Sequence, residues 1–189
     1  MTESLHLLPN GWCLGAIKIP SPNFGLRPVA EDVSLLVIHN ISLPPGQFGT
    51  QKIQPFFQNR LDHGEHPYFA SIDGLQVSAH FLIERDGSLT QFVSTTHRAW
   101  HAGVSSFEGR PDCNDFSLGI ELEGDDSNPF TDSQYGVLEE LVAAIGERHP
   151  LHDEQGALRI RGHSDIAPGR KTDPGPHFDW SRVPAIHSA

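Results

Sequence analysis

The chain has 189 residues and a formal net charge of -11, with 24 acidic against 13 basic residues. Such a charge argues against a nucleic-acid partner, because proteins that hold a phosphate backbone usually present a basic surface. A chain of this length can bury a core of its own, so we expect a single domain over residues 1–189.

The N-terminal sequence, MTESLHLLPNGWCLG, lacks the basic start, the apolar stretch and the small-residue cleavage site of a signal peptide. No later segment is apolar over the length of a membrane span. Cys13 and Cys113 allow at most one disulfide, which is weak support for an oxidising compartment, so we interpret both as thiols. These features predict a cytoplasmic protein with no membrane partner, and a monomer is the default expectation.

Residues 33–38, VSLLVI, form a continuous apolar run that is rich in β-branched side chains. Such a run is typical of a strand that is buried on both faces. His39 and Asn40 follow it directly, so we expect two polar side chains at a strand end. The proline- and glycine-rich residues 41–49 predict a loop, and a short helix over residues 52–60 can follow.

Two apolar segments, residues 79–84 and 88–93, are separated by the sequence RDG. Asp-Gly between two such runs predicts a β-hairpin. Residues 117–122, SLGIEL, indicate a further strand, and Glu121 lies within it. A carboxylate at such a position needs an explanation, because charged side chains are seldom buried without a partner.

Thr131 and Gln134 match a capping box, and apolar residues recur at helical spacing from there to about Arg148. This pattern predicts an amphipathic helix that packs on a sheet. Residues 158–161 can form a last short strand, and the sequence from Gly162 onward is a loop rich in glycine, proline and aspartate. Strands mixed with helices predict an α/β or α+β fold, with a central mixed β-sheet flanked by helices.

Histidine is frequent in this acidic chain, with 12 residues among 189. A hydrolytic zinc site needs three protein ligands and an open position for water, and neutral histidine and carboxylate side chains are the usual donors. His39 at the strand end, with His163 and Asp173 on either side of the late loop, could supply them. For any one histidine, a hydrogen-bonded and partly buried imidazole is the ordinary alternative.

The late loop, HSDIAPGRKTDPG, together with the HN pair at His39 and Asn40, resembles the AmpD-type N-acetylmuramoyl-L-alanine amidases. The resemblance extends in family order through SLLVIHNISLPPGQFG, EHPYF, VSAHFLIERDG, RAWHAGVSSFEGR and CNDFSLGIELEG. It covers nearly the whole chain, which implies a domain core over about residues 20–180. It also implies a fold similar to that of phage amidases and peptidoglycan-recognition proteins.

In that family zinc is held by two histidines and by a third ligand in the late loop. The positions that match are His39, His163 and Asp173, which implies one zinc ion per chain. Zinc held in this way can lower the pKa of a bound water to about 7, so that hydroxide is available at cytoplasmic pH.

The resemblance also assigns two catalytic residues. Glu121 would orient and deprotonate the attacking water and then pass the proton to the leaving alanine nitrogen. Lys171 would stabilise the negative oxygen of the tetrahedral intermediate. From the residues alone, Glu121 could equally be an edge-strand carboxylate that faces solvent or pairs with Arg98 or Arg110, and Lys171 a solvated loop lysine.

Further candidates, for substrate contact, are Asn40, Tyr68 and Trp100. A tryptophan face can stack on the apolar side of a sugar ring, but Trp100 could equally belong to the core. We interpret His80 as an imidazole packed inside a strand, and His97 and His101 as loop residues that can approach the substrate. Arg170 is expected to have a structural or anion-attracting role.

The motifs of zinc proteases, zinc deaminases and serine hydrolases do not occur in the sequence. The resemblance implies hydrolysis of the amide bond between N-acetylmuramic acid, in its 1,6-anhydro form, and L-alanine in small soluble muropeptides. This reaction serves cell-wall recycling and in relatives limits β-lactamase induction. One alternative is a non-catalytic module that recognises peptidoglycan fragments, and another is a phage-type lytic amidase that acts on intact wall.

Overall fold

A mixed β-sheet of six strands forms the centre of the computed structural model, which describes residues 4–152, 156 and 158–183. Its strands are β3 (Ile17–Lys18), β5 (Leu35–Ile41), β6 (Phe81–Ile83), β7 (Leu89–Gln91), β11 (Ser117–Glu123) and β12 (Ile160–Gly162). They lie in the order β12-β5-β11-β6-β7-β3. The first four are parallel to one another, whereas β6 and β7 are antiparallel. The predicted mixed α/β class is therefore confirmed.

The predicted strands and hairpin are present, with shifted ends. The apolar run 33–38 forms most of β5, but the strand continues to Ile41, so His39 and Asn40 lie within its carboxyl end. β6 and β7 form the predicted hairpin, and Gly87 adopts a φ of 90° in the turn between them. This left-handed conformation favours glycine, which explains why Asp-Gly is a reliable local signal.

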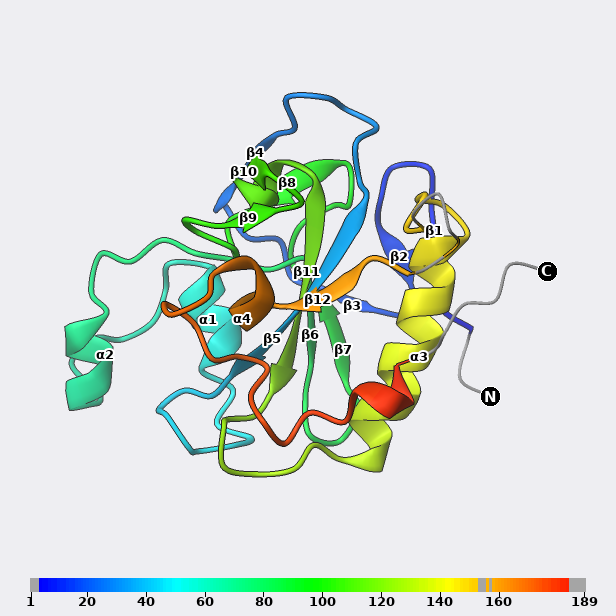
Figure 1. The fold of residues 1–189 in the computed structure, drawn as a ribbon. Helices are drawn as coiled ribbons and strands as arrows, with labels where there is room; N and C mark the ends of the chain where they lie inside the picture. The colour runs from blue at the N-terminus through cyan, green and yellow to red at the C-terminus, as the bar shows by residue number, and fades with distance from the viewer. Residues whose placement is uncertain (1–3, 153–155, 157, 184–189) are drawn as a thin grey trace.

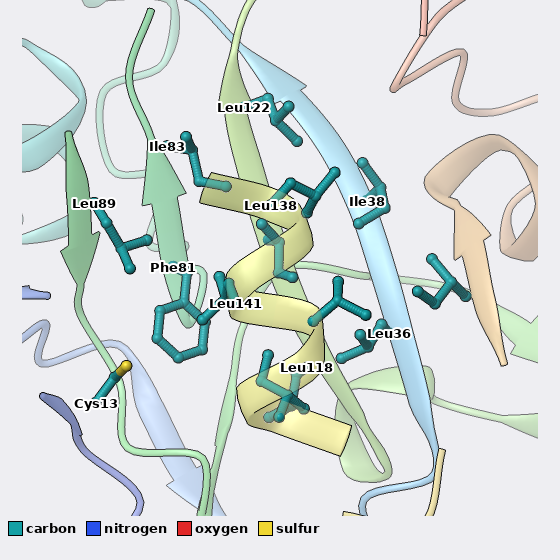
Figure 2. Packing of buried hydrophobic residues seen from close by; sticks show 14 of the residues in the cluster. Cys13, Leu36, Ile38, Phe81, Ile83, Leu89, Leu118, Leu122, Leu138 and Leu141 are labelled. Carbon is teal, nitrogen blue, oxygen red and sulfur yellow. The ribbon is translucent and has the colours of Figure 1, made fainter. Parts of the chain in front are cut away.

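Helix α3, Asp132–Gly146, covers one face of the sheet (Figure 1). The predicted capping box is confirmed, because Thr131 Oγ1 accepts a hydrogen bond from the backbone N–H of Gln134 and the Gln134 side chain accepts one from that of Thr131. Leu138 and Leu141 point from the helix onto the sheet (Figure 2). The strand side chains in this cluster include Leu36, Ile38, Phe81, Ile83, Leu118 and Leu122. Burial of each such side chain contributes roughly 1.5–3 kcal/mol, so this contact is a main source of stability.

Three short helices differ from the predictions. The helix expected over residues 52–60 is limited to α1, Ile53–Phe57, because Asn59 adopts a φ of 58° that a helix cannot continue through. Helices α2, Pro67–Ser71, and α4, His163–Ile166, were not predicted, since each is too short to show a periodic apolar pattern. The last strand is also displaced. It was expected over residues 158–161, whereas β12 spans Ile160–Gly162.

Small strand pairs and two 3-10 turns complete the described chain. They are β1 (His6–Leu7) with β2 (Cys13–Leu14), β4 (Phe24–Leu26) with β8 (His97–Ala99), β9 (Ser106–Phe107) with β10 (Arg110–Pro111), η1 (Cys113–Asp115) and η2 (Trp180–Arg182). Cys13 and Cys113 are both buried free thiols, as predicted. None of the helices in the described ranges has the length and apolar character that crossing a membrane requires.

The face of the sheet opposite α3 carries the polar side chains. Successive side chains of a strand point to opposite faces. Ile38 and Ile120 belong to the cluster under α3, so their neighbours His39 and Glu121 point to the other face. Figure 1 shows α1 and α4 on that side of the sheet. The strand alternation thus separates an apolar face, which stabilises the fold, from a face that can carry chemistry.

Candidate functional site

The carboxyl ends of β5, β11 and β12 bring three polar side chains together. His39 and Glu121 are register partners on β5 and β11, and His163 begins α4 directly after β12. Because these strands are parallel, their carboxyl ends meet at one edge of the sheet, where open α/β sheets usually bind ligands. The loop after α4 returns Asp173 to the same edge, where its carbonyl accepts a hydrogen bond of 2.9 Å from the backbone N–H of Ser164.

His39, His163 and Asp173 converge on one point. Nδ1 of His39 lies 3.0 Å from Nδ1 of His163 and 2.9 Å from Oδ2 of Asp173, and the third distance in this triangle is 3.0 Å. Both imidazoles are almost completely buried, with 2 % of each residue exposed, while Asp173 is half-buried. Their ligand atoms are close enough together to hold a single metal ion.

The electrostatics of this group favour the ligand-competent protonation states. Burial lowers the pKa of His39 from 6.5 to about 4, so its ring is neutral at physiological pH. Burial alone would raise the pKa of Asp173, but its hydrogen bonds with His163 and His39 outweigh that effect and hold the pKa below its ordinary range. Two imidazoles and a carboxylate are a donor set typical of hydrolytic zinc sites.

Glu121 is a buried carboxylate on the same face of the sheet. Only 8 % of it is exposed, and its Oε2 atom has no hydrogen-bond partner. Burial, followed by the nearby charge of Asp173, raises the pKa of Glu121 well above its usual value. The edge-strand alternative is wrong, because β11 lies between β5 and β6, and because Arg98 and Arg110 pair with other carboxylates, those of Asp115 and Asp32.

These residues line one cavity of about 480 Å³. Its volume lies within the range of small-molecule sites, which is roughly 300–1,000 Å³. Its wall contains every residue that the sequence analysis selected for the site: His39, Asn40, Tyr68, Trp100, Glu121, His163, Lys171 and Asp173. Tyr68 and Lys171 are exposed, Trp100 is half-buried, and Asn40 donates from its amide nitrogen to Asp126 and to the Pro174 carbonyl.

The chain that forms this site is similar to proteins of a known family. The sequence profile of the N-acetylmuramoyl-L-alanine amidase family matches residues 29–176, which is more than half of the chain. The chain belongs to this family. The amidase is 53% identical over 180 residues to the 1,6-anhydro-N-acetylmuramyl-L-alanine amidase AmpD of Citrobacter freundii, an alignment that covers 95% of this chain and 94% of the relative. It is therefore an amidase enzyme by membership of its family.

Two solved structures agree with the fold of this amidase. The crystal structure of a selenomethionine AmpD derivative superposes with a TM-score of 0.88 at 53% identity, covering 93% of this chain and 96% of the other. The amidase AmiD from E. coli, solved in complex with the substrate anhydro-N-acetylmuramic acid-L-Ala-D-gamma-Glu-L-Lys, superposes with a TM-score of 0.58 at 26% identity. That comparison covers 95% of this chain and 64% of AmiD.

Two further histidines and an arginine that the sequence analysis discussed have different surroundings in this amidase. His80 is completely buried, as expected, but it directly precedes β6 rather than lying within a strand. His97 lies in β8 rather than in a loop. Arg170 donates from its guanidinium to the carbonyls of Ala102 and Val104, which is the expected structural role.

His101 holds a position that sequence reasoning missed. Its ring reaches the cavity, but it also lies behind a candidate ligand, with Nδ1 2.9 Å from Nε2 of His39. The two residues are 62 positions apart in the chain. A contact over such a separation has no local sequence pattern, so composition and spacing could not have found it.

Proposed function

We propose that this amidase hydrolyses the amide bond between 1,6-anhydro-N-acetylmuramic acid and L-alanine in small soluble muropeptides. The observation that carries the proposal is the convergence of two imidazoles and a carboxylate beside the unpartnered carboxylate of Glu121, in one cavity. The sequence identity to AmpD supports the choice of bond and sugar. The substrate in the AmiD complex contains the same sugar and first amino acid.

We propose zinc, one ion per chain, as the cofactor, with His39, His163 and Asp173 as its ligands. The chemistry of the donor set fits, because two imidazoles and one carboxylate leave a position open for water or substrate. A bound zinc ion would acidify water and polarise the amide carbonyl. The buried carboxylate of Glu121 fits as well, since a nearby cation would offset the cost of its burial.

The residues around this centre have separate tasks in the proposal. Glu121 accepts a proton from the attacking water at its free Oε2 atom and delivers it to the alanine nitrogen as the bond breaks. Its pKa, raised by burial, suits both tasks, because a more basic carboxylate takes the proton from water more readily before it delivers it to the leaving nitrogen. Lys171 places a positive charge at the cavity wall, where it stabilises the negative oxygen that forms from the carbonyl.

We propose Asn40, Tyr68 and Trp100 as the substrate-binding residues of the cavity. Trp100 is half-buried in the wall, so an open part of its ring can contact an apolar sugar face. Tyr68 is 38% exposed on α2, at the same cavity. Asn40 links β5 to the loop of Asp173 through the Pro174 carbonyl, so it holds the wall in shape next to the substrate.

The biological setting is also a proposal. We infer a single domain over residues 1–189 with its core over about 20–180, acting as a monomer in the cytoplasm on fragments that enter cell-wall recycling. The removal of such fragments would limit β-lactamase induction. The profile match over residues 29–176 supports this extent of the core.

The decisive experiment measures metal content and the release of free peptide from a 1,6-anhydro-muropeptide, with and without a chelator. Stoichiometric zinc and chelator-sensitive release are expected. Zinc-free protein that binds the fragment without cleaving it would favour a recognition module. Cleavage of intact, insoluble wall at a rate equal to that of the soluble fragment would favour a lytic amidase.

A further inference from the structure

The ring nitrogen of His39 that faces away from Asp173 belongs to a second hydrogen-bonded contact. Nε2 of His39 lies 2.9 Å from Nδ1 of His101, and the two rings meet edge-on at an interplanar angle of 84°. Two ring nitrogens at this distance share one hydrogen, so one of them donates and the other accepts. The direction of this bond decides which nitrogen of His39 can bind a metal.

Ser117 determines the direction. Its hydroxyl oxygen lies 2.6 Å from the carbonyl of Cys113, which can only accept, so the single hydroxyl hydrogen is used there. The same oxygen lies 3.3 Å from Nε2 of His101. Having no second hydrogen, Ser117 can only accept from His101. The hydrogen of the His101 ring is therefore on Nε2, and its Nδ1 has a lone pair.

The protonation of His39 follows from that of His101. Nδ1 of His101 accepts, so this contact favours hydrogen on Nε2 of His39 and a lone pair on its Nδ1. That atom is the one next to Asp173. Nε2 of His163 lies 2.9 Å from the Ala102 carbonyl, which favours hydrogen on that nitrogen, while Nη2 of Arg170 donates to the same carbonyl and lies 3.3 Å from the same ring nitrogen. In this tautomer His39 directs its lone pair at the point where it meets His163 and Asp173.

We propose that His101 is a positioning residue that fixes the tautomer of His39, through the hydrogen-bond chain from the Cys113 carbonyl and Ser117. The inference rests on the proposed metal site and deepens it. A neutral histidine has two tautomers, and only the one with hydrogen on Nε2 presents Nδ1 to a metal. Without a metal, Oδ2 of Asp173 at 2.9 Å favours hydrogen on Nδ1 of His39, so the chain from Ser117 favours the tautomer that a metal needs against this contact.

The surroundings hold His101 for this task. Its backbone N–H and that of Ala102 both donate to Oδ1 of Asn114, at 3.1 and 2.8 Å. One short segment therefore supplies the acceptor for each ligand: the ring of His101 for His39, and the carbonyl of Ala102 for His163. Gly119 on β11 provides the space, because a Cβ atom there would lie 2.5 Å from Cγ of the His101 ring.

The test compares two substitutions of His101. His101→Asn retains a side-chain acceptor at the Nδ1 position, whereas His101→Phe retains a ring but no acceptor. Zinc affinity is measured by competition with a chromophoric chelator, and the His39 tautomer is measured from ring ¹⁵N shifts in zinc-free protein. We expect His101→Phe to weaken zinc binding roughly 10- to 100-fold and to mix the tautomers, and His101→Asn to restore most of the loss.

Two further variants keep the test decisive. Ser117→Ala removes the hydroxyl oxygen that accepts from Nε2 of His101, at a distance from the ligands. We expect this variant to mix the His39 tautomers even if His101→Phe does not fold. His97→Phe is the matched control: its ring packs on Phe24 rather than on His39, so zinc affinity should not change.

The outcomes separate the inference from the proposed function. Unchanged zinc affinity and an unchanged tautomer in both His101→Phe and Ser117→Ala would overturn the inference and leave the zinc amidase intact. A wild-type protein that does not bind zinc would overturn the proposed metal site. In that case the ¹⁵N shifts of the zinc-free protein would still test which nitrogen of His39 carries the hydrogen.

Discussion

Glu121 and His39 are register partners on parallel strands, and both side chains lie on the face of the sheet opposite α3. The imidazole is within hydrogen-bonding distance of Asp173 and His101, but Oε2 of Glu121 has no partner among the described residues. A buried carboxylate without a full set of partners destabilises a fold. Its presence on a central strand therefore indicates a functional requirement rather than a structural one.

Substituting Glu121 should separate activity from stability. We expect Glu121→Gln to lower kcat by at least about 100-fold, because the proton acceptor is lost, while zinc remains bound. We also expect the zinc-free variant to unfold at a higher denaturant concentration than the zinc-free wild type, by a free energy on the order of 1 kcal/mol, since a buried charge is removed.

Glu123 offers a matched control for this prediction on the same strand. It is also buried, but its carboxylate accepts hydrogen bonds from the backbone N–H groups of Gly49 and Arg85, at 2.6 and 3.2 Å. Glu123→Gln should therefore lower the free energy of unfolding. If both variants changed stability in the same direction, the unpartnered state of Glu121 would not be the cause.

Substitution of Asp173 should remove zinc binding, whereas substitution of Lys171 should lower kcat and leave zinc bound. Asp173→Ala deletes a proposed ligand, so the purified protein should contain almost no zinc and have no activity. Lys171→Ala should retain stoichiometric zinc but lose kcat, by roughly 2–4 kcal/mol in activation free energy, because a positive charge near the reacting oxygen is lost. Metal analysis and steady-state kinetics measure both effects.

Lys52→Ala serves as the control, because this lysine pairs with Glu65 at an exposed position. Its zinc content and kcat should equal those of the wild type. Stoichiometric zinc in Asp173→Ala would contradict the ligand assignment, and a Lys171→Ala protein with full kcat would remove the proposed role of that ammonium group.

Trp100 should act through substrate binding. We expect Trp100→Leu to raise KM severalfold with a smaller change in kcat, because the half-buried ring lines the cavity but is not among the groups that move protons or hold metal. The change is measured with a soluble anhydro-muropeptide. Trp180→Leu is the control, since Trp180 contacts Phe178 and is 42% exposed. Equal KM values in the two variants would rule out stacking by Trp100.

Local signals in the sequence were sufficient for the long elements of the fold. The capping box at Thr131 and the Asp-Gly turn before Ser88 depend on hydrogen bonds and φ values within a few residues, so a sequence pattern can predict them. Helices α2 and α4 contain too few residues for a period to be visible. The carboxyl end of β5 was missed for another reason. The apolar pattern stops before His39, but the backbone of His39 continues the strand regardless of its polar side chain.

The site depends on contacts between distant parts of the chain. Spacing alone left His39, His163 and Asp173 as candidates, and their selection as ligands came from the resemblance to a family. Their convergence needs the parallel order of β12, β5 and β11, which no local pattern specifies. The contact of His101 with His39 depends on the same order and on the space beside Gly119.

Acid should destabilise the zinc-free protein partly through His149. This residue is buried, with Nε2 3.2 Å from Oγ1 of Thr95, and burial followed by the charge of Arg148 lowers its pKa from 6.5 to about 4. Between these pH values the unfolded chain binds a proton that the folded protein does not. The free energy of unfolding should therefore fall as the pH is lowered from 6.5 to 4, by up to about 1.4 kcal/mol per pH unit for one group.

Replacing this histidine should flatten that pH dependence. His149→Gln cannot take up a proton, so its free energy of unfolding, measured by denaturant titration in the presence of a chelator, should fall less between pH 6.5 and 4 than that of the wild type. The pKa of the buried His80 is also lowered, by burial and by Arg27, so part of the pH dependence of the free energy of unfolding remains in both proteins. His6→Gln, at an exposed position, controls for the loss of a histidine as such. A slope in His149→Gln as steep as in the wild type and in this control would show that His149 does not couple acid to unfolding.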